Sequence, residues 1–199
     1  MAFLRSRGIT DEERRRLPPG QHLVRDFPVL HAGSVPYREA PPGWDFRIWG
    51  GVEEEGRWSL EEFRELPTVS VTTDIHCVTS WSKLDTRWEG VALWPLLERL
   101  GVSGRMTHAV AHSEEGYTAN VPLERLRADD VLLAYRFDGD ELEPQHGGPL
   151  RLLVPSLYFW KSAKWLRGLE LLDHDAPGFW ERLGYSNTAD PWKEERYAF

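Results

Sequence analysis

The stretch TVSVTTDIHC, residues 68–77, decides the fold. It is rich in valine and threonine, whose β-branched side chains favour extended backbone, and therefore predicts a strand that ends at Cys77. A short helix is predicted just before it. Ser59 and Glu62 form a capping-box pattern at the start of that helix, and Pro67 ends it. The sequence thus places its single cysteine at the end of a strand.

Further strands are predicted by apolar and β-branched runs at 46–49, 107–112, 117–121, 131–135, 150–154 and 165–172. The clearest helix has its leucines at positions 93, 96, 97 and 100, which is helical spacing, and Gly101 suits its end. Shorter helical segments are expected at 122–127 and 177–183. Strands outnumber helices and do not alternate with them regularly. This pattern predicts a single α+β domain with mainly antiparallel or mixed sheets and short helices.

Composition narrows the class of protein. The chain has 199 residues, of which 41% are hydrophobic and 28% are charged, which suits one globular core. We expect an N-terminal arm over 1–20, ending in Pro18-Pro19-Gly20, and one domain over 21–199. The net charge of −8 argues against a nucleic-acid partner, which normally binds a basic surface.

The sequence also predicts a cytoplasmic protein. A single cysteine cannot form an intramolecular disulfide, so nothing in the cysteine content indicates secretion. Consecutive arginines at 14–16 are not followed by the apolar stretch of an export signal. No run approaches the ~20 apolar residues that a membrane helix needs, so no membrane insertion is expected.

Cys77 allows three interpretations on the residues alone. A lone cysteine is most often a small buried hydrophobic side chain. It can also be a catalytic thiol with His76 as its base, or a soft thiolate ligand for a metal. Adjacent strand residues point to opposite faces, which makes His76 a poor base for Cys77. A structural zinc site is not favoured, because such a site takes four ligands and the chain has no second cysteine.

Two basic segments in the second half of the chain suggest an anion site. HGGPLR, residues 146–151, combines two glycines, which allow close approach of the backbone to a ligand, with an arginine that can bind a phosphate through two hydrogen bonds. KSAKW, residues 161–165, adds two lysines among small and aromatic side chains. The alternative is a basic surface turn beside a hydrophobic strand.

The order and spacing of several short blocks resemble the sulfite oxidase family, and most closely its short bacterial members without haem and dimerisation domains. The resemblance extends from about Pro18 to Tyr197. The blocks are His76-Cys77-Val78, Trp81-Ser82, Trp88-Glu89-Gly90-Val91, Gly116-Tyr117-Thr118, the Gly-Pro-x-Arg segment ending at Arg151, Val154-Pro155 and Lys164-Trp165.

The resemblance implies that residues 21–199 are a molybdopterin-binding catalytic domain. Its cofactor would be molybdenum–molybdopterin, with the metal bound by one pterin dithiolene, oxygen ligands and the thiolate of Cys77. The residues that it implies for the pterin and its phosphate are His146, Arg151, Ser162, Ala163 and Lys164, together with an upstream contact within His31 to Ser34 and one near Ser113.

The implied function is two-electron oxygen-atom transfer on a small-molecule substrate, with electrons exchanged with a separate partner protein. Tyr117 and Tyr185 are the expected catalytic-pocket residues beside Cys77, and Trp81, Lys83 and Trp192 are further candidates for its wall. Sulfite-oxidising members have an arginine where this chain has Ser82, so sulfite is not the expected substrate. A non-catalytic module that binds a pterin or another phosphorylated ligand is the alternative function.

Overall fold

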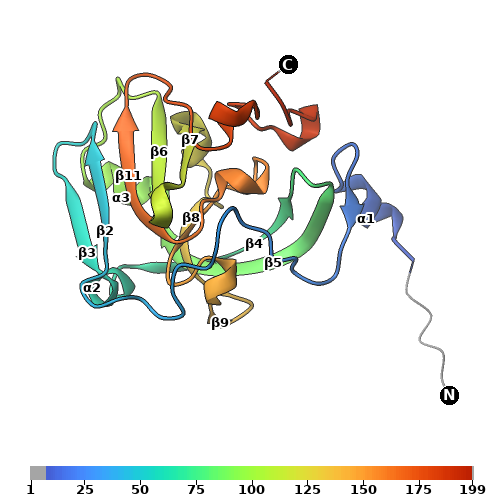
Figure 1. Cartoon of the computed structure of the whole chain (residues 1–199), viewed down its shortest axis with the longest axis horizontal. Helices are drawn as coiled ribbons and strands as arrows, with labels where there is room; N and C mark the ends of the chain where they lie inside the picture. The colour runs from blue at the N-terminus through green and yellow to red at the C-terminus, as the bar shows by residue number, and fades with distance from the viewer. Residues whose placement is uncertain (1–7, 199) are drawn as a thin grey trace.

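The computed structural model describes residues 8–198 and contains two β-sheets (Figure 1). The first has strand order β1-β5-β8-β10, with β4 paired to β5 and β9 to β8. Its strands are β1 (His22–Leu23), β4 (Thr68–His76), β5 (Trp81–Ala92), β8 (Leu132–Phe137), β9 (Asp140–Glu141) and β10 (Arg151–Leu153). The second has the order β3-β2-β11-β6-β7. Its strands are β2 (Asp45–Gly50), β3 (Gly56–Ser59), β6 (His108–Ser113), β7 (Thr118–Pro122) and β11 (Leu166–Leu172).

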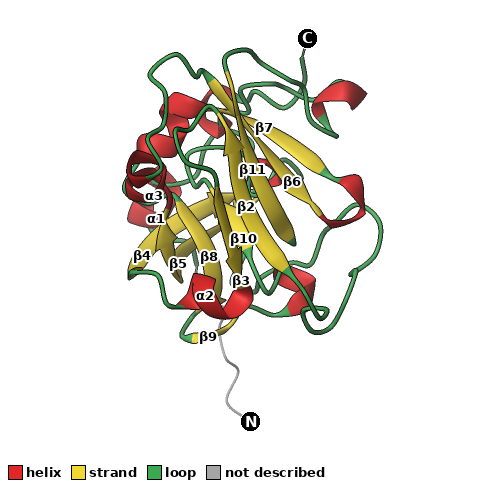
Figure 2. Ribbon diagram, turned by 90° about the vertical axis from the view of Figure 1, so that its left-hand side faces the viewer, coloured by secondary structure: helices red, strands yellow, loops and turns green. Residues whose placement is uncertain are grey.

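Most neighbouring strands are antiparallel, while the pairs β1–β5 and β2–β11 are parallel. The helices are short and lie around the sheets (Figure 2). The expected α+β class with mixed sheets is therefore confirmed. Of the described residues, 8–198, none belongs to a helix both long and apolar enough to cross a membrane.

Side-chain alternation along β8 separates two apolar clusters. Leu133 and Tyr135 face the main core, which fills the space between the sheets and includes Phe46 and Leu169 of the second sheet. Leu132 and Ala134 face the other side of the first sheet, in a smaller cluster that contains Cys77, Trp81, Trp88 and Phe159. The cysteine thus lies on the outer face of the first sheet rather than in the main core.

Helix α2 (Leu60–Arg64) begins as the sequence predicts. The Ser59 hydroxyl accepts a hydrogen bond from the backbone N–H of Glu62, whose side chain accepts one from the Ser59 N–H, so the capping box is confirmed. Helix α3 (Leu93–Arg99) buries Leu93, Leu96 and Leu97. The segment 122–127 forms a 3₁₀ helix over Leu123–Arg127. The 177–183 segment contributes only a 3₁₀ turn over Glu181–Leu183.

The twelve-residue strand β5 was not among the expected strands, although it is the longest in the fold. Its signal is nonetheless present in the sequence. Leu84, Thr86 and Trp88 are buried, whereas the intervening Asp85 and Arg87 are exposed. This period-two alternation is typical of a strand with one face in the core, and the charged residues between the buried ones obscured it.

Residues 8–20 of the expected N-terminal arm are attached to the domain, and residues 1–7 lie outside the described part of the chain. Helix α1 (Asp11–Arg15) has its own capping box at Thr10. The guanidinium of Arg16 then donates hydrogen bonds to Asp74 of β4 and Asp85 of β5. The arm is thereby attached to the hairpin whose turn carries Cys77.

Candidate active site

Cys77 begins the tight turn that joins β4 to β5. The backbone N–H of Cys77 donates to the carbonyl of Trp81 at 2.8 Å, and its carbonyl accepts from Ser80 at 3.0 Å. Ser80 takes a left-handed conformation with φ of 74° to complete the turn. The Gln21 side-chain amide also donates to the Cys77 carbonyl, at 3.0 Å. These contacts fix the backbone of the cysteine from three sides.

The hairpin register directs His76 away from Cys77. His76 pairs with Ser82 across the hairpin, and their side chains hydrogen-bond to each other at 2.8 Å between Nδ1 and Oγ. Burial lowers the pKa of His76 to about 4, so the imidazole is neutral near pH 7. The arrangement agrees with the expectation that His76 does not act as a base for Cys77.

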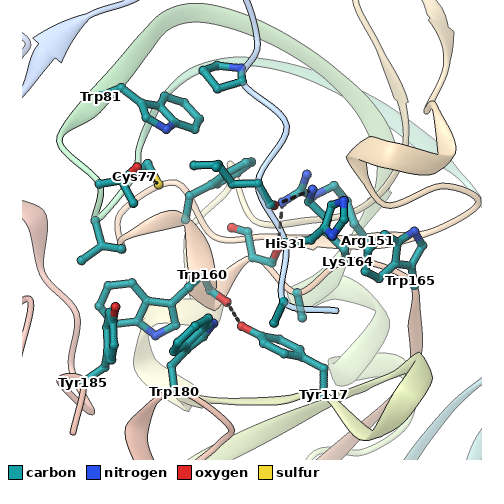
Figure 3. Close-up of a pocket in the computed structure, with 18 of the residues that line it drawn as sticks. His31, Cys77, Trp81, Tyr117, Arg151, Trp160, Lys164, Trp165, Trp180 and Tyr185 are labelled. Carbon is teal, nitrogen blue, oxygen red and sulfur yellow. Dashed lines mark hydrogen bonds between the residues drawn. The ribbon is translucent and has the colours of Figure 1, made fainter. Parts of the chain in front are cut away.

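Cys77 lines a cavity of about 240 Å³ (Figure 3). Eight of the residues predicted for the site lie together on its wall: His31, Cys77, Tyr117, Arg151, Ser162, Ala163, Lys164 and Tyr185. They come from segments far apart in the sequence: the loop after β1, the β4–β5 turn, the residue just before β7, strand β10, the 161–165 segment and the C-terminal region. The fold therefore assembles most of the predicted site in one place.

Arg151 is a fully buried cation in this wall, with 0% of its surface exposed. Its guanidinium donates to the carbonyls of His146 at 2.6 Å and Ser162 at 2.8 Å, while Nε has no acceptor. Its planar group also lies 4.2 Å from the centre of the Phe159 ring. In the described part of the chain no carboxylate pairs with it. Burial accordingly lowers its pKa to about 9.

Lys164 is the second cation of the cavity, and it too has no carboxylate partner among residues 8–198. Its ammonium group donates to the carbonyl oxygens of Leu30, at 2.9 Å, and Gln145, at 2.7 Å. Burial and the nearby positive charge of Arg151 lower its pKa to about 7. Two cations in one cavity repel each other unless an anion lies between them, so the cavity is suited to a negatively charged ligand.

Lys161, the other lysine of the basic segment, does not belong to this anion site. Its ammonium group is fully buried and pairs with Glu181 at 2.6 Å, and it also donates to the carbonyl and side chain of Asn120. Of the two lysines in the basic segment 161–165, only Lys164, the one named for the phosphate, lies in the cavity wall. Only two residues lie between the two lysines, and Lys161 ends the 3₁₀ turn Phe159–Lys161 whereas Lys164 follows it, so their side chains enter different environments.

The glycines of residues 146–151 also serve a different purpose from the expected one. A Cβ atom at Gly148 would lie 2.0 Å from the Leu142 carbonyl oxygen, and one at Gly147 would lie 3.0 Å from the Lys164 side chain. Gly147 moreover has a φ of 110°. These glycines allow chain segments to approach each other, and they place Arg151 and Lys164 side by side, rather than making room for a ligand directly.

Three of the predicted cofactor residues do not line the cavity. His146 stacks its ring on Phe27 at 3.9 Å between centroids, and burial lowers its pKa to about 4. Ser34 donates to Glu115 at 3.4 Å, and the Ser113 hydroxyl is buried with no hydrogen-bond partner among the described residues. Their cofactor contacts stay predictions.

Aromatic side chains make up the wall on the Cys77 side of the cavity. Tyr117 donates its hydroxyl proton to the Trp160 carbonyl at 2.7 Å, and burial raises its pKa. Trp160 and Trp180 each contact the ring of Tyr185. Trp160 and Trp180 were not predicted, because aromatic residues without helical or strand periodicity carry no sequence signal for a pocket. Lys83 and Trp192 do not line it.

The donor set fits a molybdenum–pterin cofactor. Such a cofactor needs one soft protein ligand, which the buried thiol of Cys77 can supply as a thiolate, and a cationic cradle for its phosphate. Burial raises the pKa of this thiol, whereas the charges of Arg196 and Lys164 favour its ionised form. Among residues 8–198 no group of three His, Cys, Asp or Glu side chains could hold a metal by itself.

Lys164 gives the cofactor-free protein a characteristic pH dependence. Its pKa is lower in the folded protein than in the unfolded chain, so the unfolded state binds more protons between pH 7 and about 10. The free energy of unfolding is expected to rise with pH across this window, by at most about 1.4 kcal/mol per pH unit from this group. Lys164→Met should reduce that rise, measured by urea unfolding at pH 7 and pH 9.5.

The matched control for this measurement is Lys193→Met, because Lys193 lies on the surface. It should leave the wild-type pH dependence in place. Equal slopes for wild type and Lys164→Met would contradict the buried-cation assignment. An added anion that binds the cavity should stabilise the wild type most at the lower pH, where Lys164 carries its charge.

Comparison with known proteins identifies a family match over most of the chain. The model of the oxidoreductase molybdopterin binding domain matches residues 32–180. The uncharacterized oxidoreductase YuiH of Bacillus subtilis (strain 168) is 44% identical over 188 residues, which cover 94% of this chain and 95% of YuiH.

Further similar proteins are larger. The protein-methionine-sulfoxide reductase catalytic subunit MsrP of Gluconobacter oxydans (strain 621H) is 32% identical over 72% of this chain and 51% of its own length. Sulfite oxidase of Arabidopsis thaliana is 25% identical over 84% of this chain and 53% of its own. The chain thus spans about half the length of these two relatives. The structure of sulfane dehydrogenase SoxCD from Paracoccus pantotrophus superposes on this chain with a TM-score of 0.60 at 24% sequence identity. The superposition covers 71% of this chain and 40% of the SoxCD chain, and it shows that the two share a fold.

Proposed function

Because this chain belongs to the oxidoreductase molybdopterin binding domain family, we propose that it catalyses two-electron oxygen-atom transfer at a molybdenum centre bound through Cys77. The resemblance to the sulfite oxidase family that the sequence indicated is confirmed, as are the oxidoreductase class and the molybdopterin cofactor. When bound, this cofactor supplies a metal that alternates between oxidation states two electrons apart.

The observation that carries the proposal is the meeting of Cys77 with two unpaired cations in one cavity. A buried thiol alone would indicate no more than a packed hydrophobic residue. Arg151 and Lys164 add a site for a phosphate, and a metal–pterin cofactor is a ligand that uses a thiolate at one end and a cationic cradle at the other. His31, Ser162 and Ala163 complete the wall beside these cations.

Each group of the chain then has a defined task. Cys77 binds the metal, and the turn around it holds the sulfur in place. Arg151 and Lys164, already held by four backbone carbonyls, orient the phosphate. Tyr117 and Tyr185, with the tryptophans around them, form an apolar wall that excludes bulk water from the substrate.

We further propose an uncharged substrate, such as a sulfoxide. The cations that line the cavity belong to the phosphate cradle, and aromatic rings surround the Cys77 side. Arg196, whose charge reaches Cys77, donates to the Val78 carbonyl and does not line the cavity. MsrP is named as a reductase of a sulfoxide, which supports this choice. In the reducing direction the S–O bond breaks, two protons and two electrons are consumed, and the oxygen leaves as water.

We also propose that the two electrons are exchanged with a separate partner protein. The relatives include a reductase named as a catalytic subunit, which agrees with such an arrangement. The cytoplasmic location expected from the sequence stays a prediction, which cell fractionation would test.

The test is a metal and substrate assay on protein from molybdate-supplemented cells. We expect close to one molybdenum per chain, reduction of an aryl methyl sulfoxide by a reduced viologen dye, and no oxidation of sulfite by ferricyanide. Protein without metal and without a pterin released by acid would refute the enzyme assignment. Rapid sulfite oxidation would refute the proposal of an uncharged substrate and would still support the assignment as a molybdenum enzyme.

A further inference from the structure

Trp81 and Cys77 both line the cavity, and the indole N–H of Trp81 has no hydrogen-bond acceptor in the described part of the chain. Its ring is 94% buried, being only 6% exposed, yet its indole nitrogen has no hydrogen-bond acceptor among residues 8–198. The other buried tryptophans each have one: Trp44 donates to Tyr37, Trp88 to Thr86 and Trp165 to Pro144. Leaving a buried donor without an acceptor destabilises the folded protein, so the orientation of Trp81 calls for a ligand or an acceptor in the cavity.

The hairpin register explains where this N–H points. His76 is paired with Ser82 across the hairpin. One residue closer to the turn, Cys77 and Trp81 are therefore opposite each other, and their side chains share the face that is turned to the cavity. Directly opposite residues have Cβ atoms about 5 Å apart, which brings an indole within reach of the facing side chain. Figure 3 shows the nitrogen-bearing edge of the Trp81 ring turned toward the sulfur of Cys77.

Packing prevents the ring from turning away. Phe27 meets it edge-on at 6.4 Å between centroids, and Phe159 does so at 6.3 Å. Ring rotation about its side-chain bonds would collide with these neighbours, so the orientation of the N–H is fixed before any ligand binds.

A second donor already contacts the same sulfur. The hydroxyl oxygen of Thr79 lies 3.2 Å from the Cys77 sulfur, and Thr79 also lines the cavity. Once Cys77 is a thiolate, it can only accept, so the Thr79 hydroxyl must be the donor. The Thr79 hydroxyl thus contacts this sulfur, and the unsatisfied N–H of Trp81 lies on the same face of the hairpin.

We propose that the indole N–H of Trp81 and the hydroxyl of Thr79 hydrogen-bond to the Cys77 thiolate and raise the reduction potential of the metal bound to it. Hydrogen bonds withdraw electron density from a metal-bound thiolate, which destabilises the more oxidised metal. Trp81 and Thr79 are positioning residues in this role, since they act through Cys77. The inference rests on the proposed function for its metal and on the hairpin geometry for its donors.

The first experiment measures midpoint potentials by monitoring the Mo(V) paramagnetic signal in metal-loaded protein. Trp81→Phe and Thr79→Val should each shift the Mo(VI)/Mo(V) equilibrium about tenfold toward the oxidised metal, which corresponds to ~59 mV toward lower potential. Thr79→Ser keeps the hydroxyl and should restore the wild-type value. Trp192→Phe is the matched control, because Trp192 is half-exposed and outside the cavity. Potentials unchanged in both donor variants would overturn the proposal.

The second experiment needs no metal and separates this inference from the proposed function. In cofactor-free protein, the indole ¹⁵N–¹H resonance of Trp81 is identified by its absence in Trp81→Phe. We expect Cys77→Ala to shift this resonance, because the nitrogen edge of the indole faces the sulfur, while the Trp165 resonance stays in place. A Trp81 resonance insensitive to Cys77→Ala would refute the sulfur contact, even in a sample that never takes up molybdenum.

Discussion

Cys77→Ser is expected to lower turnover by more than ~100-fold and to remove the paramagnetic signal of a thiolate-bound Mo(V). Loss of a residue that merely supports a metal ligand already costs about 10- to 100-fold in metal affinity or activity, so loss of the ligand itself must cost more. Serine has nearly the same shape, and the backbone contacts of the turn do not involve the sulfur. Folding should therefore be unaffected, as measured by circular dichroism and urea unfolding.

The same variant distinguishes an enzyme from a carrier. A module that only binds the pterin would retain Arg151 and Lys164 as its phosphate cradle and would have no need of a thiolate. Cofactor occupancy in Cys77→Ser is measured as the pterin released by acid. Full retention of turnover in a loaded Cys77→Ser protein would mean that the metal ligand lies elsewhere and would contradict the proposed site.

Arg151→Gln is expected to weaken cofactor binding about 10- to 100-fold. A hydrogen bond to a charged group contributes about 1.5–3 kcal/mol, and each ~1.4 kcal/mol is a factor of ten in affinity. Glutamine can still donate to one of the two carbonyls that Arg151 holds, those of His146 and Ser162, so the local backbone keeps part of its support. Pterin content of protein purified under identical loading conditions measures the effect.

The control for this charge removal is Arg136→Gln, a partly exposed arginine that pairs with Glu89 and Glu141 outside the cavity. It should load like the wild type. Wild-type occupancy in a folded Arg151→Gln protein would contradict the phosphate-cradle role. Stability must be measured alongside, because removing a buried unpaired charge relieves a desolvation cost while leaving a carbonyl without its donor.

The sequence sufficed to predict the strand that ends at Cys77, because β-branched residues constrain the backbone locally. It also sufficed for the helix that begins after Ser59, because a capping box satisfies backbone donors within four residues. Both features depend on neighbours in the chain, and both are confirmed. Strand β5 had an equally local signal in its alternating buried residues, but the charged residues between them concealed it.

Which residues line the cavity is decided by long-range contacts, which no local sequence pattern encodes. Lys161 and Lys164 look alike in the sequence, and only the position of Glu181, twenty residues beyond the first, decides that Lys161 is neutralised internally. Trp160 and Trp180 likewise become wall residues through long-range contacts: the Tyr117 hydroxyl donates to the Trp160 carbonyl, and the N–H of Phe179, beside Trp180, donates to the Thr118 carbonyl of β7. Long-range packing of this kind has no periodicity from which it could be predicted.

The tight turn at Cys77 has a consequence for electron transfer. The backbone of the cysteine is fastened by Trp81, Ser80 and Gln21, and Arg16 secures the hairpin to the N-terminal helix. If Cys77 binds the metal as proposed, a ligand held so firmly would have nearly the same position in every oxidation state. Little movement of atoms would then accompany each electron, which would favour fast electron exchange at a small driving force.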